Sequence, residues 1–583
     1  MSLAADSLRE IEPLVLDPVG RVQNNFSSIG RFRGKKNPSA DERTILEYFF
    51  TNVDSNIYAA KDTLPSELAA LLLGKYARSK ITAKGRLMAE FKAMEKEGQI
   101  DISEFAESIR RDQRADNVID LATRRAAKKI KDIGITYGHA SVRDSGRITM
   151  FFEGVSELST SILESAREGA YQEQSTRAIP FTQQNLGVPY EIRGTEWEGK
   201  VAQLDLKLMN LYQKVREGMH PYLKTNFGHL REEANGKLRE INGPKFKQIS
   251  DKDWQSFLEA KGFDVARQLL PRNMTTSLGM VLTTRRFQDQ LTEWQSHPVM
   301  EIRALGRAAQ VEATKISPHL MPHGKPSEFY LGLPEILRTA SETYTSDLPS
   351  MGPYEPTEPT SRIIGSTPNL ESMVLAGALL GGTNGEYTFE GLVGTVDKMG
   401  SDVKSGIAQR IMSQKGHHDL YPKIFETGGI TFERRMDIGS HKDYKRQRGD
   451  RQQKSRFGAV GYVMQPEIPK IGLEREFRKI MAEVKTLYEQ MVDAGLGYVA
   501  EYIPVMANTM VQVTTRDPVQ QFYEAGLRAQ PAGHDNYRSI AIQEIEATLD
   551  LLPSFKGLIP YDSKKAHPLG RLVEHIEKSR IRR

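Results

Sequence analysis

The chain has 583 residues, of which 39% are hydrophobic and 27% charged, so we expect a globular protein of two or more domains. It contains no cysteine, which excludes disulfides, thiolate metal sites and cysteine nucleophiles. The net charge of +5 is small for this length and permits anionic substrates without arguing for nucleic acid. No apolar run approaches the ~20 residues that span a bilayer, and residues 1–18 do not resemble a secretory signal, so we expect a cytoplasmic protein.

The N-terminal part of the chain predicts helices. Thr63 precedes Pro65 at an expected helix start, and apolar residues then recur at helical spacing as far as Tyr76. A second helix is expected over residues 87–94, after Thr82. We therefore predict that residues 1–130 form an N-terminal segment and a helical extension that packs on the next domain.

A pattern then occurs twice. Residues 146–151 read Gly-Arg-Ile-Thr-Met-Phe and residues 428–432 read Gly-Gly-Ile-Thr-Phe. Arg167 follows the first isoleucine by 19 positions and Arg448 follows the second by 18. The triplet Thr-Thr-Arg also occurs twice, ending at Arg285 and Arg516, in the same order along the chain. The shared order predicts a duplication, in which the first copy carries about 50 extra residues between Pro180 and Asp264.

Strand-like and helix-like segments are mixed within each copy, which predicts the α+β fold class. Residues 148–152 and 429–432 are rich in strand formers. Helical periodicity is found over residues 157–167, 197–212, 302–315, 474–492 and 540–551.

The expected boundaries follow from the turn-forming residues. Five prolines between residues 348 and 369 predict a stiff extended spacer rather than a packed element. We expect a first domain over residues 131–345, a linker over 346–369 and a second domain over 370–583. The glycine-rich stretch 377–385 lacks a following Gly-Lys-Ser/Thr, so we interpret it as a mobile or tightly turned connector and not as a phosphate loop.

The densest group of functional side chains is the segment 171–177, Tyr-Gln-Glu-Gln-Ser-Thr-Arg. Arg177 can hold a phosphate through a planar two-pronged contact, and Ser175 offers a hydroxyl and a backbone N–H. Glu173 and Gln174 can read the polar edges of a ring or a sugar. The mixture predicts a nucleotide site, and a capped helix end is the alternative.

This segment and its surroundings resemble the flavin-dependent thymidylate synthases, whose signature reads Arg-His-Arg, seven intervening positions, then Gln-Ser-x-Arg. The residues that carry the resemblance are 138–142 (Gly-His-Ala-Ser-Val), 153–156 (Glu-Gly-Val-Ser), Arg167, 171–177, Val265-Ala266-Arg267, Pro271 and 283–285. The similarity covers about residues 135–320 and, more faintly, 415–560. It implies two α/β domains in tandem, with sites of the kind that this family forms between subunits of a tetramer.

The two copies depart from the signature in different ways. The first reads Ser165-Ala166-Arg167 in place of Arg-His-Arg, whereas the second reads Arg446-Gln447-Arg448. The second copy has a scrambled Gln-Ser-x-Arg at residues 452–456, and Glu501 stands where Arg267 would be matched. Arg528 restores a late arginine that the first copy lacks. Because the losses are complementary, we expect one composite site between the copies.

The resemblance implies a role for each retained residue. Substrate-binding roles fall to Glu173, Gln174, Ser175, Arg177 and Arg267, and flavin-binding roles to His139, Arg167, Arg446, Gln447 and Arg448. Catalytic roles fall to Ser175, Arg177 and Arg528, of which Arg528 would polarise a uracil carbonyl. For His139, a hydrogen-bonded structural histidine is the alternative. No metal is expected, because His441-x-Asp443 lacks a third ligand at helical spacing.

These expectations define a function, the reductive methylation of dUMP to dTMP with FAD, methylenetetrahydrofolate and NADPH. With no cysteine thiolate to attack uracil, reduced flavin would supply the hydride. We expect a homodimer that forms a pseudo-tetramer. One alternative is a relative that binds nucleotides or nucleic acid without catalysis. The basic stretch 433–456 favours this alternative. Aromatic residues for base stacking are sparse there, so nucleic acid is not the expected partner. Another alternative is a flavin enzyme acting on a different pyrimidine nucleotide.

Overall fold

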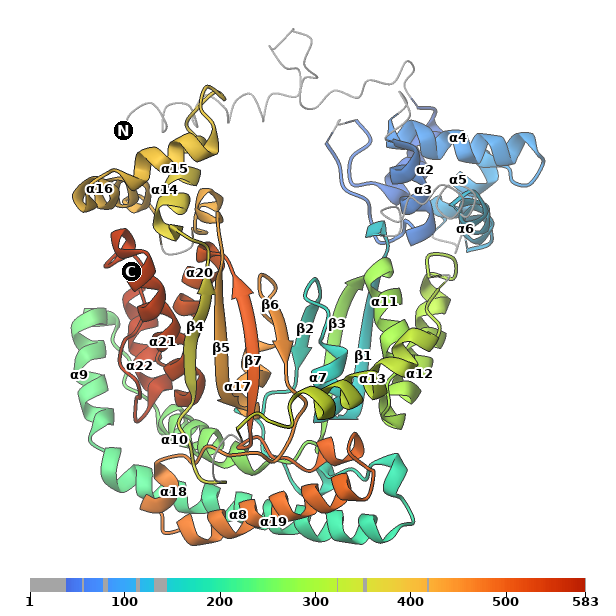
Figure 1. Ribbon diagram of the computed structural model, residues 1–583. Coiled ribbons are helices and arrows are strands. Elements are labelled where there is room, and N and C mark those ends of the chain that lie inside the picture. Colours follow the sequence, from blue (N-terminus) through green and yellow to red (C-terminus); the bar gives the residue numbers. More distant parts are fainter. Residues whose placement is uncertain are drawn as a thin grey trace. The chain divides into compact units, whose positions relative to one another are not determined.

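The computed structural model describes residues 38–54, 57–76, 82–111, 116–130, 144–321, 323–349, 354–416 and 419–581. The chain forms two compact units (Figure 1). The first unit comprises Met1–Met150, Val281–Ser296 and Ala304–Leu331, and the second comprises Phe151–Met280, His297–Arg303 and Gly332–Arg583. The predicted domain boundaries stay a prediction. For brevity, residues 131–345 are called the first half and residues 370–583 the second half.

The first unit contains the expected N-terminal helices, which are α2 (Ala40–Phe49), α3 (Ser66–Tyr76), α4 (Ala83–Lys96), α5 (Ile102–Arg110) and α6 (Asp116–Ile130). Thr82 begins α4 as expected, because its side chain accepts a hydrogen bond from the backbone N–H of Gly85. Buried apolar side chains from these helices, such as Phe49 and Phe91, form one core that also includes Leu320. The helices predicted over residues 65–76 and 87–94 are thus confirmed.

Two sheets carry the strands of the two halves. The strand order is β1–β3–β2 in the first sheet and β4–β5–β7–β6 in the second. The strands are β1 (Arg147–Ser156), β2 (Ala170–Glu173), β3 (Thr275–Thr283), β4 (Thr360–Ser366), β5 (Ile430–Asp437), β6 (Arg451–Lys454) and β7 (Thr509–Arg516). The second sheet is antiparallel, with Phe432 opposite Thr514 in its centre. The expected mixture of helix and sheet is confirmed.

The same order of elements occurs around each sheet. In the first half, α7 (Glu157–Leu163) follows β1 and α11 (Thr284–Gln295) follows β3. In the second half, α17 (Ile438–Tyr444) follows β5 and α20 (Pro518–Arg528) follows β7. The last strand residue or its neighbour caps each helix through its side chain, as Ser156, Thr283, Asp437 and Asp517. Short polar caps therefore fix where each strand passes into its helix.

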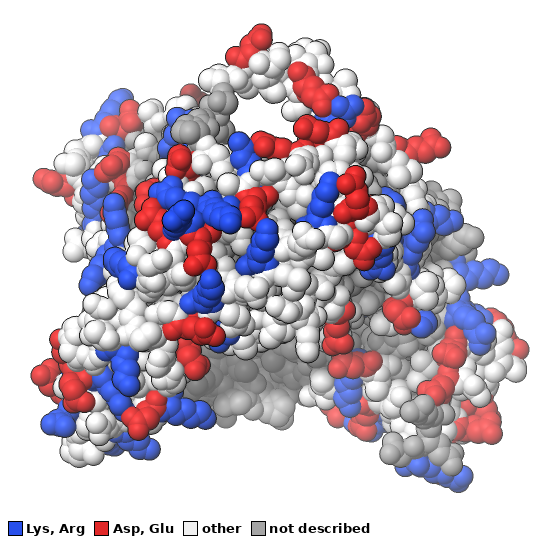
Figure 2. Space-filling view, turned by 90° about the horizontal axis from the view of Figure 1, so that it is seen from below, with Lys and Arg blue, Asp and Glu red and all other residues white. Residues whose placement is uncertain are grey.

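Three helices, among them the two longest in the described part of the chain, α8 (Glu196–Phe227) and α19 (Glu474–Asp493), lie at one end of the second unit. In Figure 1, α8, α10 (Asp251–Ala266) and α19 lie below the ends of β4, β5 and β7. Two ion pairs of 2.7 and 2.8 Å, Lys207–Glu483 and Lys214–Glu476, join α8 to α19. Figure 2 shows that positive and negative side chains are interspersed over this face, so it offers no basic stripe of the kind that tracks a nucleic-acid backbone.

The remaining helices complete the chain. They are α9 (Leu230–Asn242), α12 (Met300–Ile316), α13 (Glu328–Tyr344), α14 (Leu370–Leu380), α15 (Phe389–Asp397), α16 (Ser401–Met412), α18 (Glu467–Lys470), α21 (Asp535–Leu551) and α22 (Gly570–Ile581). Helices α8 and α9 occupy the stretch in which the extra residues of the first copy were expected. Within the described ranges, no helix is long and apolar enough to cross a membrane.

Two expectations about the connection between the halves are wrong. The proline-rich spacer contains β4, which pairs antiparallel with β5 from Thr360 to Ser366. The glycine-rich connector begins inside α14, where Gly377 is a helical residue. A Cβ on Gly377 would lie 2.4 Å from the Thr427 hydroxyl and 2.9 Å from the Ile424 carbonyl oxygen, so this glycine permits close packing. Only farther on, at Gly385 with φ of 90°, does the expected turn occur.

Candidate functional site

The segment 171–177 leaves strand β2 and enters a junction between the two halves. The backbone N–H of Gln174 donates to the carbonyl oxygen of Ser277 (3.0 Å), which fixes the segment on β3. Ser175 is exposed, and its hydroxyl accepts from the backbone N–H of Arg177 (3.2 Å). The Arg177 side chain points into the protein with 13% of its surface exposed.

The guanidinium of Arg177 is held by groups from both halves. Nε and Nη2 donate to the two carboxylate oxygens of Asp264, on α10, at 2.6 and 2.7 Å. Nη1 donates to the Tyr537 hydroxyl (3.0 Å), and Nη2 also donates to the Ala532 carbonyl oxygen (2.8 Å). Burial raises the pKa of Asp264, but Arg177 outweighs this effect and holds that pKa below its ordinary value. The pair is therefore charged, and both edges of the guanidinium are in use.

The predicted arginines of both halves gather around a second carboxylate, Asp443. Nη2 of Arg267 lies 3.2 Å from its carboxylate, and Nη2 of Arg528 donates to its backbone carbonyl oxygen. Burial raises the pKa of Asp443, yet its final pKa is below the ordinary value because Arg267, Arg528, Arg177 and Arg446 all favour the ionised form. Four arginines that were predicted from the sequence as site residues thus favour the ionised form of one carboxylate, Asp443.

Tyr537 contacts two of these arginines. The guanidinium carbons of Arg177 and Arg528 each lie 5.6 Å from the centroid of the Tyr537 ring. Tyr537 belongs to α21 and Arg528 to α20, so the second half brings both groups to the first-half arginine. Arginines from both halves therefore contact the same aromatic ring.

Glu173 occupies a different environment from the one expected of a ligand-binding side chain. Its carboxylate accepts from the Thr160 hydroxyl (2.8 Å), contacts the ammonium group of Lys442 and lies 3.4 Å from that of Lys445. Burial raises its pKa, but the two lysines lower it to about 2. Only 1% of the Glu173 side chain is exposed, so the structure makes it part of the contact between the halves.

This contact is acidic on one side and basic on the other. Glu157 and Glu164, on and beside α7, join Glu173 from the first half. Lys442 and Lys445, on and beside α17, come from the second half, and Lys445 lies 3.0 Å from Glu164. All five side chains are at most 6% exposed. The second half thus supplies counter-charges for Glu173 and Glu164, whereas Glu157 also lies 3.2 Å from Arg272 of its own half.

The arginines expected to hold the flavin make fewer hydrogen bonds and ion pairs within the protein than Arg177 does. Nη1 of Arg167 donates to the Asp450 carbonyl oxygen (3.2 Å), which places it beside the second-half segment that begins at Arg446. Within the described ranges, the side chains of Arg446 and Arg448 make no hydrogen bond or ion pair. The Gln447 side-chain oxygen, with its amide turned, accepts from Nη2 and Nε of Arg528 at 3.0 and 3.1 Å. His139 lies outside the described residues.

Arg446 and Arg448, whose guanidinium groups make no hydrogen bond or ion pair within the described ranges, fit an anionic cofactor. Arg446 is half-buried and Arg448 is exposed, so each can present unused N–H groups to a diphosphate. Arg167 adds a third guanidinium from the other half. The donor set therefore suits the diphosphate of a flavin dinucleotide better than it suits a metal. Among the described residues, no cluster of three His, Cys, Asp or Glu side chains is arranged to hold a metal ion.

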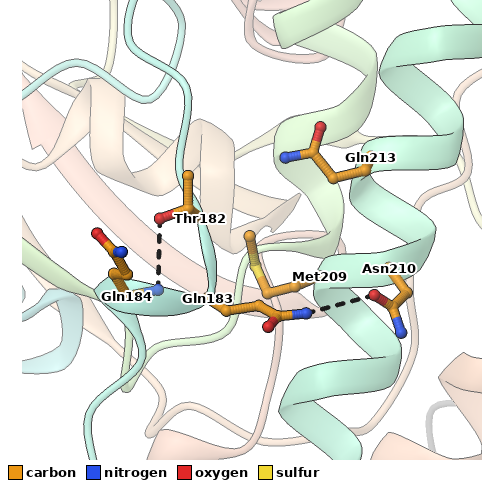
Figure 3. Close-up of a pocket in the computed structure, with 6 residues that line it drawn as sticks. All are labelled: Thr182, Gln183, Gln184, Met209, Asn210 and Gln213. Carbon is orange, nitrogen blue, oxygen red and sulfur yellow. Dashed lines mark hydrogen bonds between the residues drawn. The ribbon is translucent and has the colours of Figure 1, made fainter.

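A separate hollow of about 390 Å³ lies between α8 and the short 3₁₀ helix Gln183–Asn185 (Figure 3). It is lined by Thr182, Gln183, Gln184, Met209, Asn210 and Gln213. Figure 3 shows the Gln183 amide directed at Asn210, to which it donates at 3.4 Å. None of these six residues is charged, so the hollow is unsuited to a phosphate, and it contains none of the predicted site residues.

Several residues that organise the junction were missed from the sequence. They are Asp264, Asp443, Lys442, Lys445 and Tyr537. A signal was available for two of them, because Asp264 and Asp443 each stand three positions before a predicted arginine, Arg267 and Arg446. The lysines and Tyr537 meet their partners across hundreds of residues, which no local pattern reveals.

Residues 86–319 match the family model of the thymidylate synthase complementing protein. This match supports the resemblance seen in the first half, and it does not extend to the second. Relatives match more of the chain. A UPF0159 protein of Chlamydia muridarum is 25% identical over 551 residues, which cover 92% of this chain and 97% of that protein. A UPF0159 protein of Thermoplasma acidophilum is 24% identical over 475 residues, or 77% of this chain and 91% of that protein.

Among solved structures, a UMP/dUMP methylase, PolB from Streptomyces cacaoi, bound with 5-Br dUMP, aligns with 15% sequence identity. The alignment covers 35% of this chain and 96% of that chain with a TM-score of 0.30. A TM-score this low carries no argument about fold or substrate. The names of the UPF0159 relatives assign no activity, so the function rests on the site itself.

Proposed function

We propose that this protein binds dUMP in one site shared by two tandem synthase-like copies and methylates it reductively to dTMP, using FAD, methylenetetrahydrofolate and NADPH. The observation that carries the proposal is the convergence of Arg177, Arg267, Arg446 and Arg528 on Asp443. These arginines come from both halves, and each was selected from the sequence for a nucleotide or flavin role. We further propose that the chain works as a cytoplasmic homodimer, which would bring four copies together.

Repeated hydrogen bonds support the tandem arrangement. After β1, the N–H groups of Glu157 and Leu158 donate to the carbonyl oxygens of Met274 and Arg272 (2.9 and 3.0 Å). After β5, those of Ile438 and Gly439 donate to Asn508 and Met506 at the same two distances. A third pair matches as well, since Gln174 bonds Ser277 as Ser455 bonds Val511. Each donor is displaced by 281 positions and each acceptor by 234, so one framework is built twice.

The charges of the junction suit a nucleoside monophosphate. Arg267, Arg446 and Arg528 surround a single carboxylate, which leaves positive charge for a dianionic phosphate. A charge-assisted hydrogen bond from a guanidinium contributes about 1.5–3 kcal/mol. The Gln447 amide orients Nε and Nη2 of Arg528, and Arg528 would polarise a uracil carbonyl as negative charge develops on it.

The flavin would supply the hydride when bound, because the chain has no thiolate to activate uracil. Arg167, Arg446 and Arg448 would hold its diphosphate from both sides of the junction. The protein's own contribution is then to anchor two anions next to each other and to orient the ring of the nucleotide.

The proposal is tested by separate substitutions in the two halves. Purified protein should carry flavin absorbance, and Arg177→Met and Arg446→Met should each reduce dUMP-dependent oxidation of the reduced flavin by at least about tenfold, since a lost charged hydrogen bond is worth more than 1.4 kcal/mol. Arg478→Gln is the matched control, because this exposed arginine forms its ion pairs with Glu474 and Glu355, outside the junction. If either junction variant keeps full nucleotide-dependent oxidation, the shared site is wrong.

One observation favours a second candidate, a relative that binds nucleotides without catalysis. Arg177 gives both edges of its guanidinium to protein groups, and Glu173 is neutralised by two lysines. A colourless protein that binds dUMP and transfers no methyl group would support this candidate. A flavoprotein that methylates another pyrimidine nucleotide would instead preserve the chemistry and change the substrate. Retention on heparin that falls steeply with salt would point to nucleic acid.

A further inference from the structure

Arg177 cannot hold a phosphate in the arrangement that the structure shows. A two-pronged contact needs one free edge of the guanidinium. The Nε–Nη2 edge is taken by Asp264, and the Nη1–Nη2 edge by the Tyr537 hydroxyl and the Ala532 carbonyl oxygen. The two edges differ in what holds them, because only Asp264 offers two charged oxygens, the same pair of acceptors that a phosphate would present.

A second cation stands next to Asp264. Arg571, the second residue of α22, donates from Nη2 to the backbone carbonyl oxygen of Arg177 (2.7 Å). Burial lowers the pKa of Arg571, and Asp264 is the first of the groups that oppose this effect. Asp264 and Arg571 both line one small hollow of about 20 Å³, which has room for about one water molecule. The Asp264 carboxylate therefore has an alternative partner within the same hollow.

We infer that Asp264 competes with the nucleotide phosphate for Arg177, and that Arg571 receives the Asp264 carboxylate when the phosphate binds. The inference rests on the proposed function and adds a residue that sets the affinity of the site. Two N–H···O contacts at 2.6 and 2.7 Å are exchanged for two contacts with the phosphate. The cost of uncovering Arg177 is reduced because Asp264 moves from one guanidinium to another and is never left without a counter-charge.

The inference predicts opposite effects for the two partners of Asp264. Asp264→Asn removes the competing charge at nearly constant volume, so dUMP should bind at least about fivefold more tightly in calorimetric titrations. Arg571→Gln removes the alternative partner and keeps Asp264 on Arg177, so dUMP should bind at least about threefold more weakly. Asp535→Asn is the matched control, because Asp535 lines the same hollow but pairs with Lys261, at 2.7 Å, and not with Arg177. Its dUMP affinity should equal that of the unaltered protein.

The outcomes separate this inference from the proposed function. If the unaltered protein binds dUMP and Asp264→Asn binds it equally or more weakly, the competition is wrong while the nucleotide site stands. If Asp264→Asn does not fold, Arg571→Gln decides, and unchanged or tighter binding by that variant overturns the inference. If folded protein of every variant binds no dUMP, the nucleotide site and the competition fail together.

Discussion

Pro271 and Val505 face each other in an antiparallel bridge, and each stands four residues before a strand, β3 at Thr275 and β7 at Thr509. Neighbouring bonds extend this contact, since the N–H of Met506 donates to the carbonyl oxygen of Leu270 at 3.0 Å. Residues that the proposed duplication would make equivalent thus meet at one place. Such a contact between equivalent positions is what a local two-fold arrangement produces. It also explains why Arg267, shortly before Pro271, comes within reach of second-half residues such as Asp443.

Asp205 should make the protein less stable as the pH rises from about 4 to about 7. It is 5% exposed on α8 and accepts a hydrogen bond of 2.5 Å from the Asn273 amide. Burial raises its pKa from 3.8 to about 7, so the folded protein holds this proton over a range in which the unfolded chain has released it. The stabilisation by protonated Asp205 is complete below the pKa that this residue has in the unfolded chain. It is lost as the pH rises through the pKa of Asp205 in the folded protein.

Asp205→Asn should therefore raise the free energy of unfolding by up to about 4 kcal/mol at pH 8 and by little at pH 4. Urea denaturation at the two pH values measures this difference. Glu217→Gln is the control on the same helix, because Glu217 is exposed and should give no such pH-dependent gain. Equal effects of Asp205→Asn at both pH values would contradict the assignment.

The buried charge network of the second half should be costly to break. Arg434 donates to Glu544 and Glu524 at 2.7 Å, and Arg516 contacts both carboxylates. Glu544→Gln leaves two buried guanidinium groups undercompensated, so the free energy of unfolding should fall by about 3–5 kcal/mol. Glu483→Gln, at the exposed pair with Lys207, should cost less than about 1 kcal/mol in the same denaturation experiment. Similar losses for both variants would show that burial does not govern the Arg434 network.

Glu173 should matter for stability and not for ligand contact. Glu173→Gln removes the counter-charge of Lys442 and Lys445. We expect the free energy of unfolding to fall by on the order of 3 kcal/mol, which would be seen as a lower thermal midpoint. Any loss of dUMP affinity should then be small under conditions where the variant is folded. The opposite result, lost affinity at unchanged thermal midpoint, would restore the substrate-binding role expected from the sequence.

Gly439 should be required for the placement of Arg267. A Cβ at this position would lie 3.0 Å from Nη2 of Arg267 and 3.0 Å from an Asp437 carboxylate oxygen. Gly439→Ala should therefore weaken dUMP binding several-fold by displacing the guanidinium. Gly236→Ala is a matched control inside α9, where nothing lies within 4 Å of the added carbon. There the substitution should stabilise the protein by roughly 0.5–1 kcal/mol and leave binding unchanged.

The sequence was a good guide where the structure is decided locally. Helices with clear periodicity, such as those over residues 474–492 and 302–315, were placed to within a few residues of α19 and α12. The strands at residues 148–152 and 429–432 were found because strand formers follow a glycine. The polar caps after these strands are short-range features of the same kind. The repeated motifs at Gly146 and Gly428 are offset by 282 positions, close to the 281 positions that separate the repeated hydrogen-bond donors.

Pairing between segments that are distant in the chain could not be predicted from the sequence. The segment of β4 contains no local sign that it pairs with β5, some 70 residues away, and its prolines suggested a spacer. Arg177 was expected to hold a phosphate, whereas in the structure its side chain binds Asp264 and Tyr537, which lie 87 and 360 positions away. A side chain suited to phosphate is equally suited to a carboxylate, so the sequence alone could not distinguish a ligand contact from an internal one. The expected roles of all the predicted site residues, Ser175, Gln174, Arg448 and His139 among them, stay predictions.

The opposite charges of Glu164 and Glu173 in one half and Lys442 and Lys445 in the other restrict how such a chain can change in evolution. A half freed from its counterpart would expose either a set of carboxylates or a set of ammonium groups that evolved to be covered, and two identical halves would repel where unlike halves attract. We therefore expect that exchanging one half for a duplicate of the other would remove these buried ion pairs and destabilise the fold. Selection for any single activity would then act on both halves of the chain.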